Sequence, residues 1–252
     1  MKADELKIVG LRSIPEVAAE DDLARLIFEA AEREGQRLVG GSAVVVAQKI
    51  VSKAEGRVVD LRTVEPSPQA ESFGRKHGRD PRLVEVILQQ TRRVVRMERG
   101  IMIVETHHGL VCANAGVDQS NVPGEHFVTL LPCDPDASAE SIRQGLRKLA
   151  GCDLAVIVSD TFGRPWREGL ANVAIGAAGF QPLKDYRGRK DRHGRVLRGT
   201  VIAVADELAS AAGLLMGKAD GAPVVLISGV VLPPGAGSAR EILRPPDQDL
   251  FR

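Results

Sequence analysis

The sequence has few aromatic residues and almost no net charge, and these two deficits limit its function classes. Aromatic side chains make up 3% of its 252 residues. Stacking surfaces for the bases of a single-stranded nucleic acid are therefore scarce. The 34 lysines and arginines nearly balance the 33 aspartates and glutamates, which leaves a formal charge of +1. The overall charge therefore indicates neither a nucleic acid nor a strongly acidic partner.

The sequence also lacks a paired cysteine motif and a hydrophobic run of membrane length. Its three cysteines, Cys112, Cys133 and Cys152, form no C-x-x-C pair, which argues against a structural zinc site or a disulfide framework. The first ten residues, MKADELKIVG, contain no apolar signal-peptide core, and no apolar run approaches a membrane span. We expect a cytoplasmic protein that binds no nucleic acid and no membrane.

Short β-branched runs alternate with helical segments along the chain, without an internal repeat or a low-complexity linker. Strands are predicted at 6–11, 43–47, 58–61, 101–105, 155–158, 200–205 and 224–228. Helices are predicted at 21–34 (with Asp21 or Asp22 as the cap), 72–93, 139–149 (with Ser138 as the cap) and 206–215, and 179–198 is predicted as a long loop. This alternation alone favours an α/β sheet. The length permits one large domain or two small ones that share one site.

The most informative stretch reads LAVIVSDTFGRPWREG and starts at position 154. A buried strand is predicted to break there into Asp160 and Thr161. Oxygen ligands at a rigid strand end suit Mg²⁺ or Mn²⁺. Arg164 and Arg167 follow and would suit a phosphate or a carboxylate. The alternative is that Asp160 only caps the next helix.

A second unusual stretch reads THHGLVCANAGVDQSN and starts at position 106. His107 and His108 are adjacent, so on a strand they point to opposite faces, and at most one is interpreted as functional. Asp118, Ser120 and Asn121 supply oxygen and amide groups within one turn. The alternative is an Asx-type turn that satisfies its own backbone.

Three further segments place charge on turns or loops. Lys49 and Lys53 follow the second strand and could meet phosphate oxygens, although solvated lysines are commoner. The turn MGKADGAP at 216–223 matches no Walker motif. The basic run 187–198 suits a polyanionic substrate or RNA, but Asp191 interrupts its charge and aromatic residues are few, which disfavours RNA.

Five motifs occur along the chain in a fixed order: VSKAEGR, GLVCANAGVDQSN, SDTFGRPWREG, MGKADG and the ARE…RPPDQDLFR tail. Together they resemble the coenzyme F420 gamma-glutamyl ligase family, from about Ile8 to Arg252. The resemblance implies an α+β fold of two intertwined α/β subdomains in a homodimer. It also implies a single ligase domain over 1–252, without the nitroreductase-like domain that follows it in many bacterial relatives.

The resemblance implies a GTP-dependent ligase that adds L-glutamate to the lactyl carboxylate of coenzyme F420-0, with a second, γ-linked glutamate as a further step. Transfer of the GTP γ-phosphoryl group would give an acyl phosphate, which the glutamate amine attacks. Such chemistry needs charge neutralisation by two divalent cations, Mg²⁺ or Mn²⁺. A monovalent cation is a further expected cofactor. A metal-dependent nucleotide phosphohydrolase that uses the same aspartates is the alternative.

The resemblance also assigns site residues. Asp118 and Asp160 match ligands of one metal, and Thr161 matches a ligand of the second. The expected nucleotide contacts are Leu11, Arg12, Ser13, Ile14, Gln48, Lys49, Lys53, Asn121, Met216, Gly217, Lys218, Ala219, Asp220, Gly221, Ala222 and Pro223, with Lys218 on phosphate. Arg164 and Arg167 are catalytic candidates on the chemistry of their side chains alone.

Overall fold

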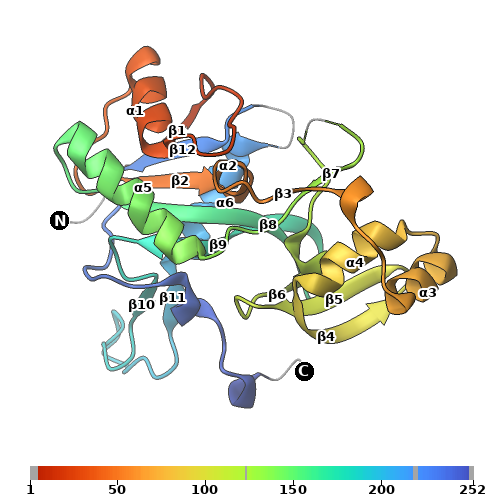
Figure 1. Ribbon diagram of the computed structural model, residues 1–252. Coiled ribbons are helices and arrows are strands. Elements are labelled where there is room, and N and C mark those ends of the chain that lie inside the picture. The colour runs from red at the N-terminus through yellow and green to blue at the C-terminus, as the bar shows by residue number, and fades with distance from the viewer. Residues whose placement is uncertain (1–4, 123, 218–220, 250–252) are drawn as a thin grey trace.

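The computed structural model describes residues 5–122, 124–217 and 221–249. Its main sheet has five strands in the order β1-β12-β2-β8-β9 (Figure 1). They are β1 (Lys7–Leu11), β2 (Ala43–Ala47), β8 (Ala155–Arg164), β9 (Arg167–Ala178) and β12 (Val224–Ser228). β2 and β8 are parallel, whereas the other neighbouring pairs are antiparallel. The mixed sheet agrees with the expected α+β class and differs from the parallel sheet of an α/β fold.

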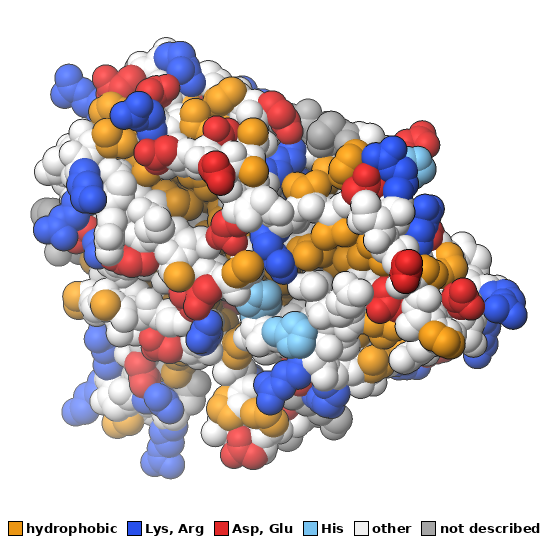
Figure 2. Space-filling model, viewed as in Figure 1, with side chains coloured by type: hydrophobic (Ala, Val, Ile, Leu, Met, Phe, Trp, Pro, Cys, Tyr) orange, Lys and Arg blue, Asp and Glu red, His pale blue; other side chains and the backbone are white. Residues whose placement is uncertain are grey.

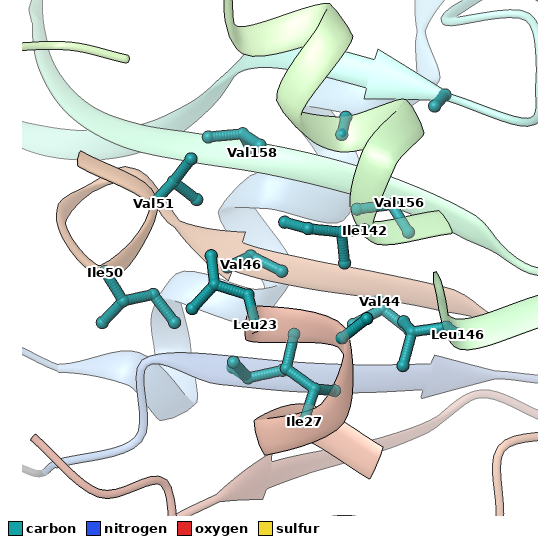
Figure 3. Close-up of a cluster of buried hydrophobic side chains, with 14 of the residues drawn as sticks. Leu23, Ile27, Val44, Val46, Ile50, Val51, Ile142, Leu146, Val156 and Val158 are labelled. Atoms are coloured by element: carbon teal, nitrogen blue, oxygen red, sulfur yellow. The ribbon is translucent and has the colours of Figure 1, made fainter. Parts of the chain in front are cut away.

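Helices cover both faces of the main sheet (Figure 1). α1 (Leu23–Arg33) and α5 (Pro135–Ala150) pack on one face, and α6 (Val204–Met216) packs on the other. Alternate residues of the strands supply the two cores, as the period of a strand requires. Figure 3 shows the core under α1 and α5, where strand residues Val44, Val46, Val156 and Val158 face Leu23, Ile27, Ile142 and Leu146.

A smaller part of the fold lies at the right of Figure 1. It contains the sheet β4 (Thr91–Glu98), β5 (Ile101–Thr106) and β6 (Val111–Ala113), with α3 (Pro68–His77) and α4 (Pro81–Gln89) packed against it. The ladder of β3 (Val58–Asp60) with β7 (Phe127–Thr129) and the helix α2 (Gln48–Ala54) connect this part to the main sheet.

The single helix predicted over 72–93 is wrong, because this segment forms two helices and the start of a strand. α3 ends at Gly78, whose φ of 64° is the left-handed conformation that closes many helices. α4 begins at Pro81 after the N-cap Asp80. β4 follows from Thr91, so Arg92 and Arg93 lie on a strand and not on the predicted helix.

Two predicted helix starts are corrected and one is confirmed. α5 begins at Pro135 and not after Ser138, because Asp134 is its N-cap and accepts a hydrogen bond from the Ala137 N–H. α6 begins at Val204, so the strand predicted to continue to residue 205 ends at Ala203. Of the two aspartates predicted as alternative caps of α1, Asp22 is the observed N-cap, and its side chain accepts a hydrogen bond from the Arg25 N–H.

The predicted end of one strand and one predicted loop are also corrected. The strand predicted to break after Val158 continues to Arg164, so Asp160 does not cap a helix and lies within a long β-hairpin. The long loop predicted at 179–198 contains β10 (Leu183–Asp185), which pairs with β11 (Val201–Ala203). Runs of β-branched residues mark the buried strands, but no such run marks the polar continuation of β8.

The β8–β9 hairpin contains a bulge next to the position where its polar residues begin. Val158 pairs with Gly176 and Ser159 pairs with Ala174, so Ile175 is an extra residue on β9. Such a bulge removes ladder hydrogen bonds and fixes where each later residue points.

Two aspartates satisfy the backbone around this bulge. Asp206, in the first turn of α6, accepts a hydrogen bond from the Ala174 N–H at 2.9 Å. Asp136, in the first turn of α5, accepts one from the Ala177 N–H at 2.9 Å. Because α5 and α6 lie on opposite faces of the sheet, the two carboxylates hold β9 from both sides. Burial raises the pKa of Asp206, although the hydrogen bond from Ala174 partly opposes this change.

We predict that Gly176→Ala is strongly destabilising, because its Cβ would lie 2.1 Å from the Pro135 carbonyl oxygen at the start of α5. A backbone atom at a helix start cannot move aside cheaply, so we expect a loss of about 3 kcal/mol in the free energy of unfolding, measured with denaturant. Gly199→Ala is the matched control, since a Cβ added there would meet no atom within 4 Å. Equal stability of the two variants would contradict this packing.

Candidate active site at one edge of the main sheet

Strand register brings most of the predicted site segments to one edge of the main sheet. Leu11, Val224, Val46 and Val158 pair in a single row across β1, β12, β2 and β8. β12 runs antiparallel to β1 and β2. The residues that follow this row on β1, β2 and β8 and the residues that precede it on β12 therefore lie side by side at the same edge of the sheet. The Ala47 N–H extends this row by donating to the Pro223 carbonyl oxygen at 2.8 Å.

Lys49 and Asp118 form the centre of the observed polar network. The Lys49 Nζ atom lies 2.9 Å from Asp118 Oδ2 and 2.6 Å from Ser120 Oγ. The Ser120 N–H donates to Asp118 Oδ1 at 2.7 Å, which is the Asx-type turn considered as the alternative. The turn and the lysine contact coexist, so the self-satisfied turn does not exclude a role in a site.

Electrostatics keep the Asp118 carboxylate ionised. Partial burial alone would raise its pKa, but hydrogen bonds from the Ser120 N–H and the Lys49 ammonium outweigh burial and lower it. An ionised, half-buried carboxylate next to one ammonium group is a suitable ligand for a hard cation.

Asp160 and Thr161 are adjacent on β8, so their side chains point to opposite sides of the strand. Asp160 lies on the side of β6, where its charge acts together with burial to raise the pKa of Cys112 to about 12, burial being the larger cause. Thr161 lies on the side of α6. Each side chain can therefore serve a different ion.

Asn172 is a site residue that the sequence interpretation missed. It lies opposite Thr161 on β9, and its Oδ1 atom accepts a hydrogen bond from Thr161 Oγ1 at 2.9 Å. Its Nδ2 atom donates to Met216 Sδ at 3.5 Å, and its carbonyl oxygen accepts from Ser210 Oγ at 2.8 Å. Only the cross-strand pairing reveals this role, because no local motif includes Asn172.

The predicted nucleotide contacts on β1 and the following turn are close to the row of paired residues. Leu11 is fully buried in the core, so only its backbone is available to a ligand. The backbone N–H groups of Arg12 and Ser13 both donate to Glu34 Oε1 at 2.7 Å. Ile14 packs against the core below α1. The turn is thus held by a carboxylate at the end of α1.

Two predicted contacts on α2 already have protein partners. Gln48 is 2% exposed and accepts a hydrogen bond from Ser52 Oγ. Lys53 is 8% exposed and forms an ion pair with Glu16. Lys49 is the α2 side chain that reaches the polar network.

The last predicted nucleotide segment begins where α6 ends. Met216 is buried and contacts Asn172 and Ser159 Oγ through its sulfur. Gly217 ends the helix, and Gly221, Ala222 and Pro223 lead into β12. Lys218, Ala219 and Asp220 lie outside the described residues. Asn121 is exposed, with a φ of 55°.

The arginines and histidines of the two motif stretches lie away from the row. Arg164 and Arg167 face each other across the tip of the β8–β9 hairpin, and both are exposed. His107 Nε2 donates to the Gln89 carbonyl oxygen at 3.1 Å, and His108 Nε2 donates to that of Pro132 at 2.9 Å. Both imidazole rings are thus hydrogen-bonded to backbone carbonyl groups of other segments.

Acidic and basic side chains are interspersed over the face of the molecule drawn in Figure 2. This mixture agrees with the near balance of charges in the sequence. The drawn face therefore offers no continuous basic surface of the kind that tracks a nucleic-acid backbone.

A cavity of about 280 Å³ lies at the opposite end of the main sheet, where Lys7, Gln36, Val39 and Ser42 line it. It touches none of the predicted site residues. Over the parts of the chain that the structure describes, no group of three or more His, Cys, Asp or Glu side chains is arranged to hold a metal ion. A cation at the site would therefore need oxygens from a ligand or water.

The fold and the site together define a mixed α/β protein whose oxygen-rich site lies at one sheet edge. The family model described as F420-0:Gamma-glutamyl ligase matches residues 11–229. A coenzyme F420:L-glutamate ligase of Methanothermobacter thermautotrophicus is 46% identical over 98% of this chain and 99% of its own length. The coenzyme F420:L-glutamate ligase of Methanopyrus kandleri is 48% identical over 92% of this chain and 92% of its own length. That of Methanocaldococcus jannaschii is 45% identical over 84% of this chain and 85% of its own length.

The chain belongs to the F420-0:gamma-glutamyl ligase family, as the five motifs indicated, and it is a ligase. None of the helices in the described ranges has the length and apolarity needed to cross a membrane.

If Thr161 binds a divalent cation, as the family resemblance implies, Asn172→Ala should raise the cation concentration needed for half-maximal activity about tenfold, because Thr161 loses the acceptor that orients its hydroxyl group. Activity titrated with Mg²⁺ or Mn²⁺ measures the change. In a Thr161→Ala background the same substitution should have almost no further effect. Fully additive effects would show that Asn172 does not act through Thr161. Ser210→Ala, which removes a contact only to the Asn172 backbone, is the control.

Proposed function

We propose that the protein is a GTP-dependent ligase that joins L-glutamate to the lactyl carboxylate of coenzyme F420-0, with a second, γ-linked addition as a further step, in coenzyme F420 biosynthesis. The observation that carries the proposal is the contact of Lys49 with Asp118 at the sheet edge where β2 ends beside Ser159 of β8, in a chain of this ligase family. The relatives named above support the acceptor and the amino acid. We further propose that the enzyme acts as a homodimer in the cytoplasm.

The donor set supports binding of two divalent cations. Asp118, Asp160 and Thr161 offer oxygen ligands only, which suits Mg²⁺ or Mn²⁺. Mg²⁺ commonly takes one or two carboxylates and completes its coordination with water and substrate phosphates. We propose Asp118 and Asp160 as ligands of one ion and Thr161, oriented by Asn172, as a ligand of the second. The bound cations would neutralise charge on the triphosphate during phosphoryl transfer.

The other side chains have roles that follow from their contacts. Lys49 carries the positive charge closest to Asp118, and it would interact with phosphate oxygens once a cation takes over that carboxylate. The backbone after β1 and before β12 would line the nucleotide, held in place by Glu34 and by the bond from Ala47 to Pro223. The acyl phosphate formed from the carboxylate would then be attacked by the glutamate amine, and phosphate would leave. We propose that Arg164 and Arg167 bind anionic groups of the acceptor.

We predict that Asp118→Asn and Asp160→Asn each lower the rate of ligation about a hundredfold or more, since losing a single electrostatic contact at a transition state already costs that much. The Lys49–Asp118 pair is partly exposed, so the free energy of unfolding of Asp118→Asn should change by about 1 kcal/mol or less. Glu29→Gln, on the exposed surface of α1, is the control. Normal turnover in either aspartate variant would remove that residue from the metal site.

The reaction itself is tested by mass spectrometry of the purified protein with F420-0, L-glutamate, Mn²⁺ and either GTP or ATP. We expect a product heavier by one or two glutamyl units, formed with GTP. Nucleotide hydrolysis without a glutamylated product would favour the phosphohydrolase instead. Equal yields with ATP would overturn the preference for GTP.

A further inference from the structure

The tip of the β8–β9 hairpin carries the only tryptophan of the chain in a strained conformation. Arg164 pairs with Arg167, so Pro165 and Trp166 form a two-residue turn. Trp166 has a φ of 55°. A proline followed by a residue of positive φ is the pattern of a type II turn, where glycine or asparagine is the usual second residue. A bulky side chain there is disfavoured by contact between its Cβ and the backbone.

Trp166 is also 80% exposed, so burial in a core does not account for the strained indole. Strain that persists without burial is a reason to look for a function of the side chain. Leu170, four residues further on β9, is 64% exposed and adds apolar surface to the same hairpin.

The hairpin presents three kinds of group in sequence. The proposed oxygen ligands Asp160 and Thr161 lie on β8 just after the row, and Arg164 follows roughly 10 Å further along the strand, at about 3.3 Å per residue. Trp166 lies in the turn beyond Arg164. Figure 1 shows β8 and β9 running side by side across the middle of the molecule. F420-0 has the matching order of groups: a carboxylate to be activated, an anionic phosphodiester, and a flat deazaflavin ring at the far end.

We propose that Trp166 is a stacking platform for the deazaflavin ring of the acceptor, with Arg164 and Arg167 binding the phosphodiester beside it. The inference rests on the proposed function, because it takes its ligand from that reaction. Stacking of a heteroaromatic ring on an indole needs a flat, accessible face and no hydrogen-bond pattern. Arg side chains flanking an aromatic ring suit an anion joined to a ring. The proposed nucleotide segments lie elsewhere, at the row of Leu11 and Val224, so the acceptor is the ligand that we assign to Trp166.

The test compares KM values for F420-0 and for GTP in variants of Trp166. Trp166→Asn should raise the KM for F420-0 about tenfold or more while leaving the KM for GTP unchanged. Because asparagine tolerates positive φ, the melting temperature should stay the same or rise. A structural role for the indole would give the opposite result in stability. Trp166→Phe, which keeps an aromatic face, should raise the KM for F420-0 less, and Leu170→Asn is the control on the same hairpin.

Two other outcomes would overturn the proposal. A rise in the KM for GTP, with the KM for F420-0 unchanged, would assign Trp166 to the nucleotide. A change of oligomeric state in Trp166→Asn, seen by light scattering, would assign it to contact with a second copy of the chain.

A binding measurement separates failure of this inference from failure of the proposed function. Emission of the wild-type protein reports Trp166 alone, since the chain has one tryptophan. Without nucleotide or glutamate, F420-0 should lower the sensitivity of this emission to acrylamide, because the stacked ring shields the indole. If F420-0 shields the indole but no glutamylated product forms, the stacking site stands and the proposed reaction is wrong. If product forms but F420-0 does not shield the indole, the reaction stands and the stacking site is wrong.

Discussion

The lateral pairing of Leu11, Val224, Val46 and Val158 is the constraint on which the candidate site depends. All four side chains are fully buried, and a shift of any strand by one residue would exchange the side chains that pack in the two cores. Burial in the core therefore fixes the register, and the register fixes which polar segments meet at the sheet edge. Segments from both ends of the chain thereby reach one place.

The hairpin that carries Asp160 and Thr161 needs a second constraint, because it extends beyond the cores. Asp136 and Asp206 provide it by accepting hydrogen bonds from β9 on either side of the bulge. The bulge sets the pairing of Thr161 with Asn172, and that pairing orients the threonine hydroxyl group. The raised pKa of Asp206 shows that holding this backbone with a buried carboxylate has an electrostatic cost. The hairpin geometry is thus maintained by carboxylates on α5 and α6, the helices that pack on the two faces of the sheet.

The sequence predicted the buried strands well and the polar continuations badly. The runs at 43–47 and 224–228 match β2 and β12 at both ends, because β-branched residues in a fully buried strand leave a strong local pattern. The helix predicted over 72–93 failed because one glycine in the left-handed conformation divides it, and hydrophobic periodicity does not report backbone conformation. β8 was predicted to stop at Val158 because its exposed half has no apolar pattern, although backbone pairing with β9 continues.

The candidate site was foreseen as a set of motifs but not as a set of contacts. Lys49 and Asp118 lie 69 positions apart, and their contact depends on the register of β2 and on the bridge between Asp118 and Thr129. Asn172 carries no local signal, since its role comes from its position opposite Thr161. The ligands assigned to these residues stay predictions, because motif order indicates a family and not a coordination geometry.

Backbone strain gives an independent indication of where this chain departs from the best local structure. Six non-glycine residues in the described ranges have a positive φ, and four of them lie in the two motif stretches: Asn114, Ala115, Asn121 and Trp166. Asparagine tolerates this conformation, but alanine and tryptophan do so at a cost of about 1–2 kcal/mol each. Ala115 is 1% exposed, so core packing supports its conformation, whereas Trp166 is 80% exposed. The fold explains the strain at Ala115, and the strain at the exposed Trp166 is the observation from which the proposed stacking on the acceptor ring starts.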